Sequence, residues 1–167
     1  MKYRLFDVCN YITDKIDSDK ISIEDYISTE NMVPNKGGIV RASSLPNINK
    51  ILNYKKDDIL ISNIRPYFKK IWFADKEGGC SNDVLIFRAK DGVYPQFLYY
   101  MLMNDTFFDY AMLTSKGTKM PRGDKKALME YEIPKFSFEK QRKTANVLSA
   151  IENKIKINKE INNNLVA

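Results

Sequence analysis

The chain has 167 residues and carries 27 Lys and Arg against 21 Asp and Glu, a formal net charge of +6. This length suits one domain with one extension, and 44% hydrophobic residues are enough for a core. The excess of positive charge favours a polyanionic partner, although a solvated basic surface explains it equally well. Histidine is absent, which excludes a Ser-His-Asp triad, and no Cys/His metal spacing is present.

The two cysteines, Cys9 and Cys80, lie far apart in the sequence and form no motif. We therefore expect small buried apolar residues, not a disulfide, and a reducing, cytoplasmic location. The first residues lack the apolar core of a signal peptide. No uninterrupted apolar run approaches the roughly 20 residues that span a bilayer, so no membrane association is expected.

The N-terminal part of the chain predicts short elements joined by polar loops. Residues 4–12 predict a short helix or strand, and residues 26–32 a strand that enters a turn-rich loop. A second turn-prone loop at residues 41–47 contains Arg, Ser and Asn side chains. Such side chains reach base edges and phosphates, although an ordinary surface loop is as good an interpretation for any one of them.

The middle of the chain predicts buried strands. Residues 57–66 contain a continuous apolar run of strand length that Pro66 ends. Because proline disfavours the helical region for the residue before it, Arg65 is expected to be extended. Residues 67–74 then resume as a strand rich in aromatic residues, and residues 77–83 form a turn.

The following residues predict a strand, a helix and a last strand. Residues 84–88 are apolar and of strand length. Pro95 suits the first turn of a helix, and apolar residues recur at three-to-four spacing up to residue 113. Residues 128–133 predict the last strand, which Pro134 stops.

A basic, glycine-punctuated loop connects that helix to that strand. Between residues 114 and 126 it carries five basic residues against one acidic residue, Asp124. Gly117 and Gly123 allow backbone amides to approach an anion closely. The G-x-x-x-x-G-K-[ST] pattern of a nucleotide phosphate loop is absent, so the backbone of a nucleic acid is the better candidate anion.

The candidate DNA-binding residues come from three segments. Basic residues among aromatics at residues 65–70 suit phosphate contact together with base stacking. The loop at residues 41–47 and Asn63 supply candidate base-reading side chains. The complete set is Arg41, Ser43, Ser44, Asn63, Arg65, Lys69, Lys70, Lys116, Lys119, Arg122, Lys125 and Lys126.

A long helix is predicted from Phe138 almost to the end of the chain, with Ser137 as its N-cap. Over the residues to Leu165 it would be about 42 Å long, more than the preceding domain can cover. Its heptad-like seam predicts pairing with another helix, and asparagines in such a seam fix register and partner. The alternative is a terminal helix that folds back on its own domain. The seam residues are Leu148, Ile151, Ile155, Asn158, Asn162 and Leu165.

No catalytic signature appears in the sequence. It lacks a G-x-G-x-x-G motif and the Asp/Asn-Pro-Pro-Tyr/Phe tetrad of amino-methyltransferases, to which residues 63–67 are only superficially similar. A small nuclease built on Asp58 and distant acidic residues is an alternative, but such matches are common in a chain that is 29% charged. We therefore expect no catalytic residue, no metal site and no cofactor bound by this chain.

The order of these features resembles one half of the specificity subunit of type I restriction-modification enzymes. The matching stretches are residues 58–66 with Lys69, 81–84, 95–98, 117–118 with Lys119 and Arg122, 133–134, 139–141 and 148–155. Their order and spacing extend across nearly the whole chain. This sequence departs from a full subunit because it has one such half and no internal repeat, so it is either a natural half-subunit or a fragment.

The resemblance implies an α/β (α+β) target recognition domain with a bent, barrel-like mixed sheet and flanking helices, followed by a long coiled-coil helix. The expected division is residues 1–136 for recognition and residues 137–167 for dimerisation or spacing. It also implies binding to one half-site of bipartite double-stranded DNA. The expected partners are modification subunits that bind S-adenosylmethionine, a restriction subunit reached through them, and a second copy or second half-subunit. The alternative in the same complex is an adaptor or inhibitor that does not read DNA.

Overall fold

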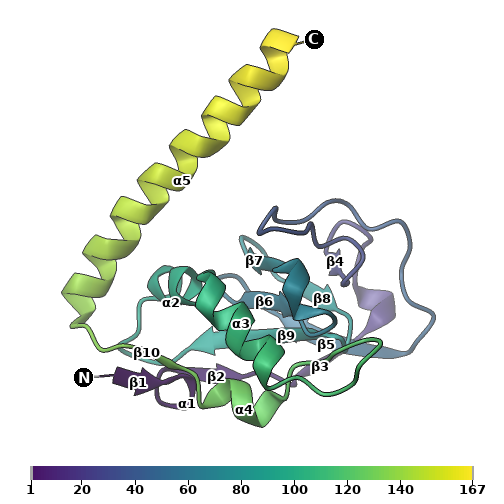
Figure 1. Ribbon diagram of the computed structural model, residues 1–167. Helices are drawn as coiled ribbons and strands as arrows, with labels where there is room; N and C mark the ends of the chain where they lie inside the picture. The colour runs from purple at the N-terminus through teal and green to yellow at the C-terminus, as the bar shows by residue number, and fades with distance from the viewer. Residues whose placement is uncertain (1, 167) are drawn as a thin grey trace.

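The computed structural model describes the backbone of residues 2–166 and the side chains of residues 2–165. Figure 1 shows a mixed α/β globule from which one long helix, α5, projects. The strands are β1 Lys2–Arg4, β2 Cys9–Tyr11, β3 Lys15–Asp17, β4 Tyr26–Ile27, β5 Lys50–Tyr54, β6 Ile59–Ser62, β7 Ile71–Phe73, β8 Gly78–Cys80, β9 Val84–Ala89 and β10 Glu132–Pro134. The helices are α1 Leu5–Val8, η1 Ser18–Lys20, η2 Pro66–Phe68, α2 Pro95–Leu102, α3 Asp105–Leu113, α4 Lys125–Met129 and α5 Phe138–Val166.

The described strands form two four-stranded sheets and one two-stranded ribbon. The first sheet has the order β2-β9-β6-β7, the second has the order β3-β5-β8-β4, and β1 pairs with β10. The pair β4–β8 is parallel, whereas the other strand pairs are antiparallel. The expected mixed α/β fold is therefore confirmed, with its strands divided between two sheets and one ribbon.

The first sheet is buried on both faces, which explains the continuous apolar runs of β6 and β9. Successive side chains of a strand point to opposite faces. Ile59 and Ile61 belong to the core cluster that contains the helical residues Phe97 and Leu98. Leu60 lies between them in β6 and belongs to the cluster formed with the second sheet. Helices α2 and α3 cover the first of these faces (Figure 1).

Four predicted elements differ from the observed ones. The predicted turn at residues 77–83 contains β8, which pairs with β4 and β5. A side chain at Gly79 would lie 2.3 Å from Ile51 Cδ1, so this glycine allows close packing and not a turn. The predicted helix at residues 95–113 is two helices, because Asn104 caps α3 by accepting a hydrogen bond from Thr106 N.

The predicted last strand at residues 128–133 is also divided. Its first residues belong to α4, which Asp124 caps by accepting hydrogen bonds from the backbone of Lys126 and Ala127. Only β10 remains as a strand, and it pairs with β1. The predicted strand at residues 67–74 likewise starts late, at Ile71, because η2 occupies the residues before it.

Cys9 and Cys80 are both buried and unpaired, which confirms their prediction as small buried residues. In the part of the chain that the structure describes, no helix is long and apolar enough to cross a membrane.

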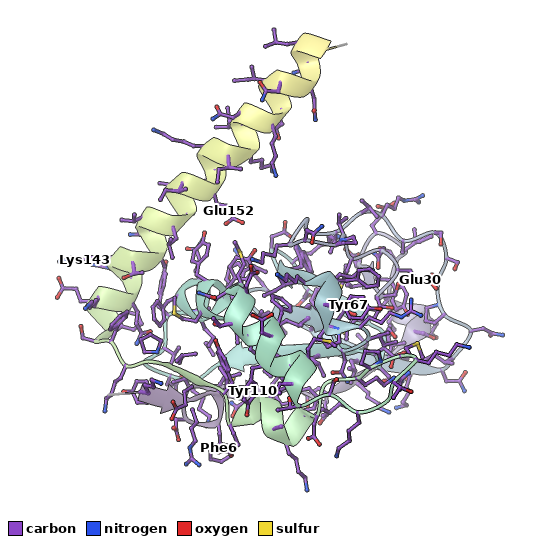
Figure 2. All side chains as sticks on the ribbon, viewed as in Figure 1. Phe6, Glu30, Tyr67, Tyr110, Lys143 and Glu152 are labelled. Carbon is purple, nitrogen blue, oxygen red and sulfur yellow. The ribbon has the colours of Figure 1, made fainter. Side chains whose placement is uncertain are left out.

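Helix α5 begins at Phe138, as predicted, and Ser137 Oγ accepts a 3.4 Å hydrogen bond from Lys140 N. Gln141 anchors the first turns: its Oε1 accepts from Tyr94 N at 2.9 Å and its Nε2 donates to Phe136 O at 2.9 Å. Ala145 is fully buried, and the helix packs against α2. Figure 2 shows Glu152 on the side of α5 that faces the globule and Lys143 on the outer side.

Candidate nucleic-acid interface

The turn at η2 is held in a strained backbone conformation. Arg65 and Lys69, on either side of it, are both left-handed, with φ values of 49° and 51°. The expectation that Arg65 is extended is therefore wrong. Two hydrogen bonds hold it instead, because Arg65 N donates to Pro121 O at 2.8 Å and Arg65 O accepts from Phe68 N at 3.0 Å. Such conformations persist when the surrounding structure over-determines them.

The basic loop folds into a hairpin that docks beside this turn. Lys116 and Arg122 exchange two backbone hydrogen bonds of 2.9 Å, and Ile64 forms an antiparallel bridge with Arg122. Gly117 has a φ of 91°, a conformation that other residues rarely adopt, at the start of the hairpin tip. Lys119 lies exposed on that tip. The docked hairpin thus brings the η2 turn and the basic loop together through backbone pairing of residues 64 and 122.

Gly123 follows the hairpin and packs directly on Asn63. A Cβ atom at Gly123 would lie 2.9 Å from Asn63 Oδ1 and 3.1 Å from Leu128 Cδ1. Asn63 is only 8% exposed, and its Oδ1 is buried without a hydrogen-bond partner. Its side chain is thus covered by the hairpin, whereas we predicted it as a base-reading residue.

A polar hollow of about 470 Å³ lies next to the hairpin. Its lining residues come from the segments at 26–31, 40–46 and 81–83, and they include the candidates Arg41, Ser43 and Ser44. Asp83 connects the hollow to the hairpin, because its carboxylate lies 3.2 Å from the guanidinium of Arg122 and its carbonyl accepts from Asn63 N at 2.8 Å. Two segments predicted separately as DNA-binding therefore border one site.

Ion pairs and hydrogen bonds hold several of the candidate cations in place. Arg41 pairs with Glu24 at 2.5 Å, and Lys70 Nζ donates to Thr29 O at 2.5 Å. Lys116 pairs with Asp124 at 2.6 Å, and this hydrogen bond lowers the pKa of the Asp124 carboxyl, which also caps α4. The ion pairs of Arg41 and Lys116 lie at the surface, where such pairs stabilise little.

Asp105 gathers two further cations at the start of α3. Its Oδ1 lies 2.6 Å from Lys36 Nζ and 3.1 Å from Lys69 Nζ, and the hydrogen bonds from Lys36 and then Lys69 lower the pKa of this carboxyl. Sequence reasoning missed Lys36, Asp83 and Asp105. Asn104-Asp105 is a typical helix start and could have been found, whereas the contact between residues 36 and 105 has no local signal.

Two of the predicted basic residues lie apart from the hollow. Lys125 and Lys126 occupy the first turn of α4, which packs against α1. The ammonium group of Lys125 sits over the Tyr11 ring at 5.1 Å. These two side chains would therefore extend a contact surface from the hairpin toward β2.

The predicted seam of α5 lies on one face of the helix, and its surroundings change along the helix axis. Leu148 packs against the core of the globule together with Ala145. By contrast, Asn158 and Asn162 are exposed. The exposed apolar residues form two rows at four-residue spacing, and both rows fall on one side of the helix. These rows are Val147, Ile151 and Ile155, then Ile157, Ile161 and Leu165. Of these, Val147, Ile157 and Ile161 were missed because the heptad template fixed the other positions.

Among residues 2–165, no group of three or more Cys, Asp or Glu side chains is arranged to hold a metal ion.

Three solved structures share the fold of this chain. The HsdS subunit from Thermoanaerobacter tengcongensis superimposes with a TM-score of 0.73 at 21% identity, covering 93% of this chain and 43% of that one. The type I restriction-modification S subunit from M. genitalium gives a TM-score of 0.65 at 20% identity, covering 93% of this chain and 40% of that one. A third structure, of type I R-M complex assembly, gives 0.72 at 20% identity, covering 95% of this chain and 44% of that one.

Curated sequences also match part of the chain. The type I restriction enzyme EcoDI specificity subunit of Escherichia coli is 33% identical over 76 residues, 46% of this chain and 17% of that subunit. The MjaIX specificity subunit of Methanocaldococcus jannaschii is 42% identical over 73 residues, 41% of this chain and 17% of that subunit. The chain spans less than half the length of the solved relatives. The family model described as "Type I restriction modification DNA specificity domain" matches residues 1–167, so the chain belongs to that family.

Proposed function

We propose that this chain reads one half-site of a bipartite DNA target as a recognition part of the specificity subunit of a type I restriction-modification enzyme. The observation that carries the proposal is the match of the DNA specificity domain family to residues 1–167. The hollow, the η2 turn and the basic hairpin support it, because they join candidate residues from three separate segments. The chain contributes recognition, and the partner subunits contribute the chemistry.

The hairpin and the hollow take different roles in this proposal. Lys119 and Arg122 contact phosphates and fix the domain on the duplex, which is sequence-independent. Arg41, Ser43 and Ser44 line the hollow and face base edges, where a good bidentate contact discriminates by about 1–3 kcal/mol. Asn63 supports the hairpin from beneath.

The exposed rows of α5 provide the assembly surface. Residues such as Ile157 and Ile161 need an apolar partner, and a second copy of this helix supplies an equivalent surface. A two-fold dimer then reads a palindromic site split by a spacer. Modification subunits dock on the paired helices, bind S-adenosylmethionine and transfer the methyl group, and the restriction subunit joins through them. This assembly operates in the reducing cytoplasm.

Reconstitution of the chain with modification subunits of the same restriction-modification system tests the proposal. Methylated positions are mapped on genomic DNA after incubation with S-adenosylmethionine. The expected result is one bipartite palindromic motif that is lost when the chain is omitted. Methylation without a motif would favour an adaptor that does not read DNA, and Mg²⁺-dependent cleavage by the chain alone would favour a nuclease.

A further inference from the structure

We propose that Tyr67 and Phe68 form an aromatic wedge that inserts at a distorted base step of the bound duplex. This inference rests on the proposed function and adds a second source of specificity, the deformability of the DNA sequence. Tyr67 and Phe68 are 46% and 38% exposed, and their ring centroids lie 4.7 Å apart. Two adjacent, exposed aromatic rings need a partner with a flat apolar face, and every base has one.

The backbone beneath the rings is held from three directions. Phe68 O accepts from Asn35 N at 2.8 Å, and Lys69 O accepts from Lys36 N at 2.9 Å. The hairpin holds Arg65 N at the other end of η2, and α3 packs against η2 from a third direction. A wedge has to be rigid to unstack bases, and these backbone hydrogen bonds and the packing of α3 provide that rigidity.

Strain concentrates at the same place. Arg65 and Lys69 adopt left-handed conformations, and so do Asn35 and Lys36 in the turn that supports them. Four non-glycine residues with positive φ therefore meet around one short turn. Strain of this kind clusters at functional sites, where the fold holds a side chain in a required position.

The charges around the rings select a polyanion over a protein as the partner. Lys36, Arg65, Lys69 and Lys70 flank the wedge, and Asp105 is the carboxylate that pairs with the first and third of them. Lys70 Nζ also lies 5.7 Å from the Phe68 ring centroid. Apolar wedges between base steps, flanked by cations on phosphates, bend DNA most readily at flexible pyrimidine–purine steps.

The wedge lies on the same end of the globule as the hollow. Figure 2 shows Tyr67 and Glu30 on the end remote from Lys143, and Glu30 lines the hollow. The bond from Lys70 to Thr29 O ties the wedge to that lining. One duplex can therefore contact the hollow, the hairpin and the wedge together.

The test compares a matched duplex with the same duplex carrying one mismatched pair, bound by the chain reconstituted with its modification subunits. A mismatch removes part of the free-energy cost of unstacking the bases. The wild type should therefore bind the mismatched duplex at least about 5-fold more tightly than the matched one. In Tyr67→Ala/Phe68→Ala the preference should disappear. Tyr67→Leu/Phe68→Leu should retain it, because leucine also acts as a wedge.

The controls separate the wedge from other roles. Lys119→Ala should weaken binding to the matched and the mismatched duplex by the same factor and so leave the preference for the mismatch intact. An alanine variant that keeps the preference, or that binds DNA normally and loses the modification subunits, overturns the wedge. A lowered melting temperature in both double variants points to a structural role and also overturns it. The assay needs no knowledge of the target sequence, so the methylation map tests the proposed function independently.

Discussion

The hydroxyl of Tyr100 donates a 2.8 Å hydrogen bond to the Glu152 carboxylate, and so ties α2 to α5 where α5 leaves the globule. Burial raises the pKa of Tyr100 to about 12, so this phenol stays protonated and able to donate at neutral pH. Tyr100→Phe keeps the ring and removes the donor. We expect the free energy of unfolding to fall by about 1 kcal/mol, measured by urea denaturation. An unchanged value would show that the contact does not hold the helix.

The two cysteines are expected to resist alkylation in the folded chain. Burial raises the pKa of the Cys9 thiol to about 12 and also raises that of Cys80, whereas the thiolate is the reactive form. Iodoacetamide at about pH 8 should therefore label neither thiol until urea unfolds the chain. The raised folded pKa values mean that the fold favours the protonated thiols. The free energy of unfolding is therefore unaffected by thiol ionisation below about pH 8.5 and falls as the pH rises toward 12. Mass spectrometry measures the extent of labelling. Rapid labelling without urea would contradict the burial of the two thiols.

Gly123→Ala should destabilise the hairpin through Asn63. The new Cβ would lie 2.9 Å from Asn63 Oδ1, and overpacking of this kind costs about 1–2 kcal/mol. Asn63→Ala removes the atom that is struck, so the double variant should be more stable than the sum of the two single changes by about 0.5 kcal/mol or more. Thermal unfolding of the four proteins measures this coupling, and strict additivity would contradict the contact.

Helix α5 should mediate self-association through its exposed apolar rows. Ile157→Asn/Ile161→Asn places polar groups on that side and should convert a dimer to a monomer at micromolar concentration. Lys156→Asn/Glu160→Asn changes the opposite side of the same turns and should leave the dimer intact. Light scattering distinguishes the two cases. Dissociation by both variants, or by neither, would argue against this surface.

Lys119 should contribute to DNA binding without affecting sequence preference. Lys119→Ala removes one phosphate contact at the hairpin tip, so the slope of log K against log salt should decrease by about one. The loss of affinity should be equal for target and non-target duplexes. Lys143→Ala, on the outer side of α5, is the matched control and should leave the slope unchanged. Fluorescence anisotropy over a salt series measures both, and a loss confined to target DNA would assign Lys119 to base readout.

Elements with a strong local signal could be predicted from the sequence. The apolar runs of β6 and β9 and the Ser137-capped start of α5 have such signals, and the structure confirms them. The break at Asn104 and the cap at Asp124 also carry local signals, but apolar periodicity and length masked them. Strand β8 could not be predicted, because its glycines serve packing against Ile51 and Asp25, which are distant in sequence.

The candidate site was predictable only in part, for the same physical reason. Basic residues near Arg65 and Arg122 were found by composition, but their contact depends on the bridge between residues 64 and 122. The role of Lys36 depends on Asp105, 69 residues away. The burial of Asn63 likewise follows from how the hairpin docks, which no local pattern encodes.

Helix α5 contacts α2 near its first turns, so a small change of angle there moves the far end of the helix by a larger distance. Beyond Glu152 the helix continues for roughly 21 Å without support from the globule. A tilt of about 10° at Glu152 would therefore displace the end of that free segment by roughly 4 Å, close to the rise of one base pair along a strand. If two copies pair through α5 as proposed, the hydrogen bond from Tyr100 to Glu152 would limit the error in the distance between the two half-sites.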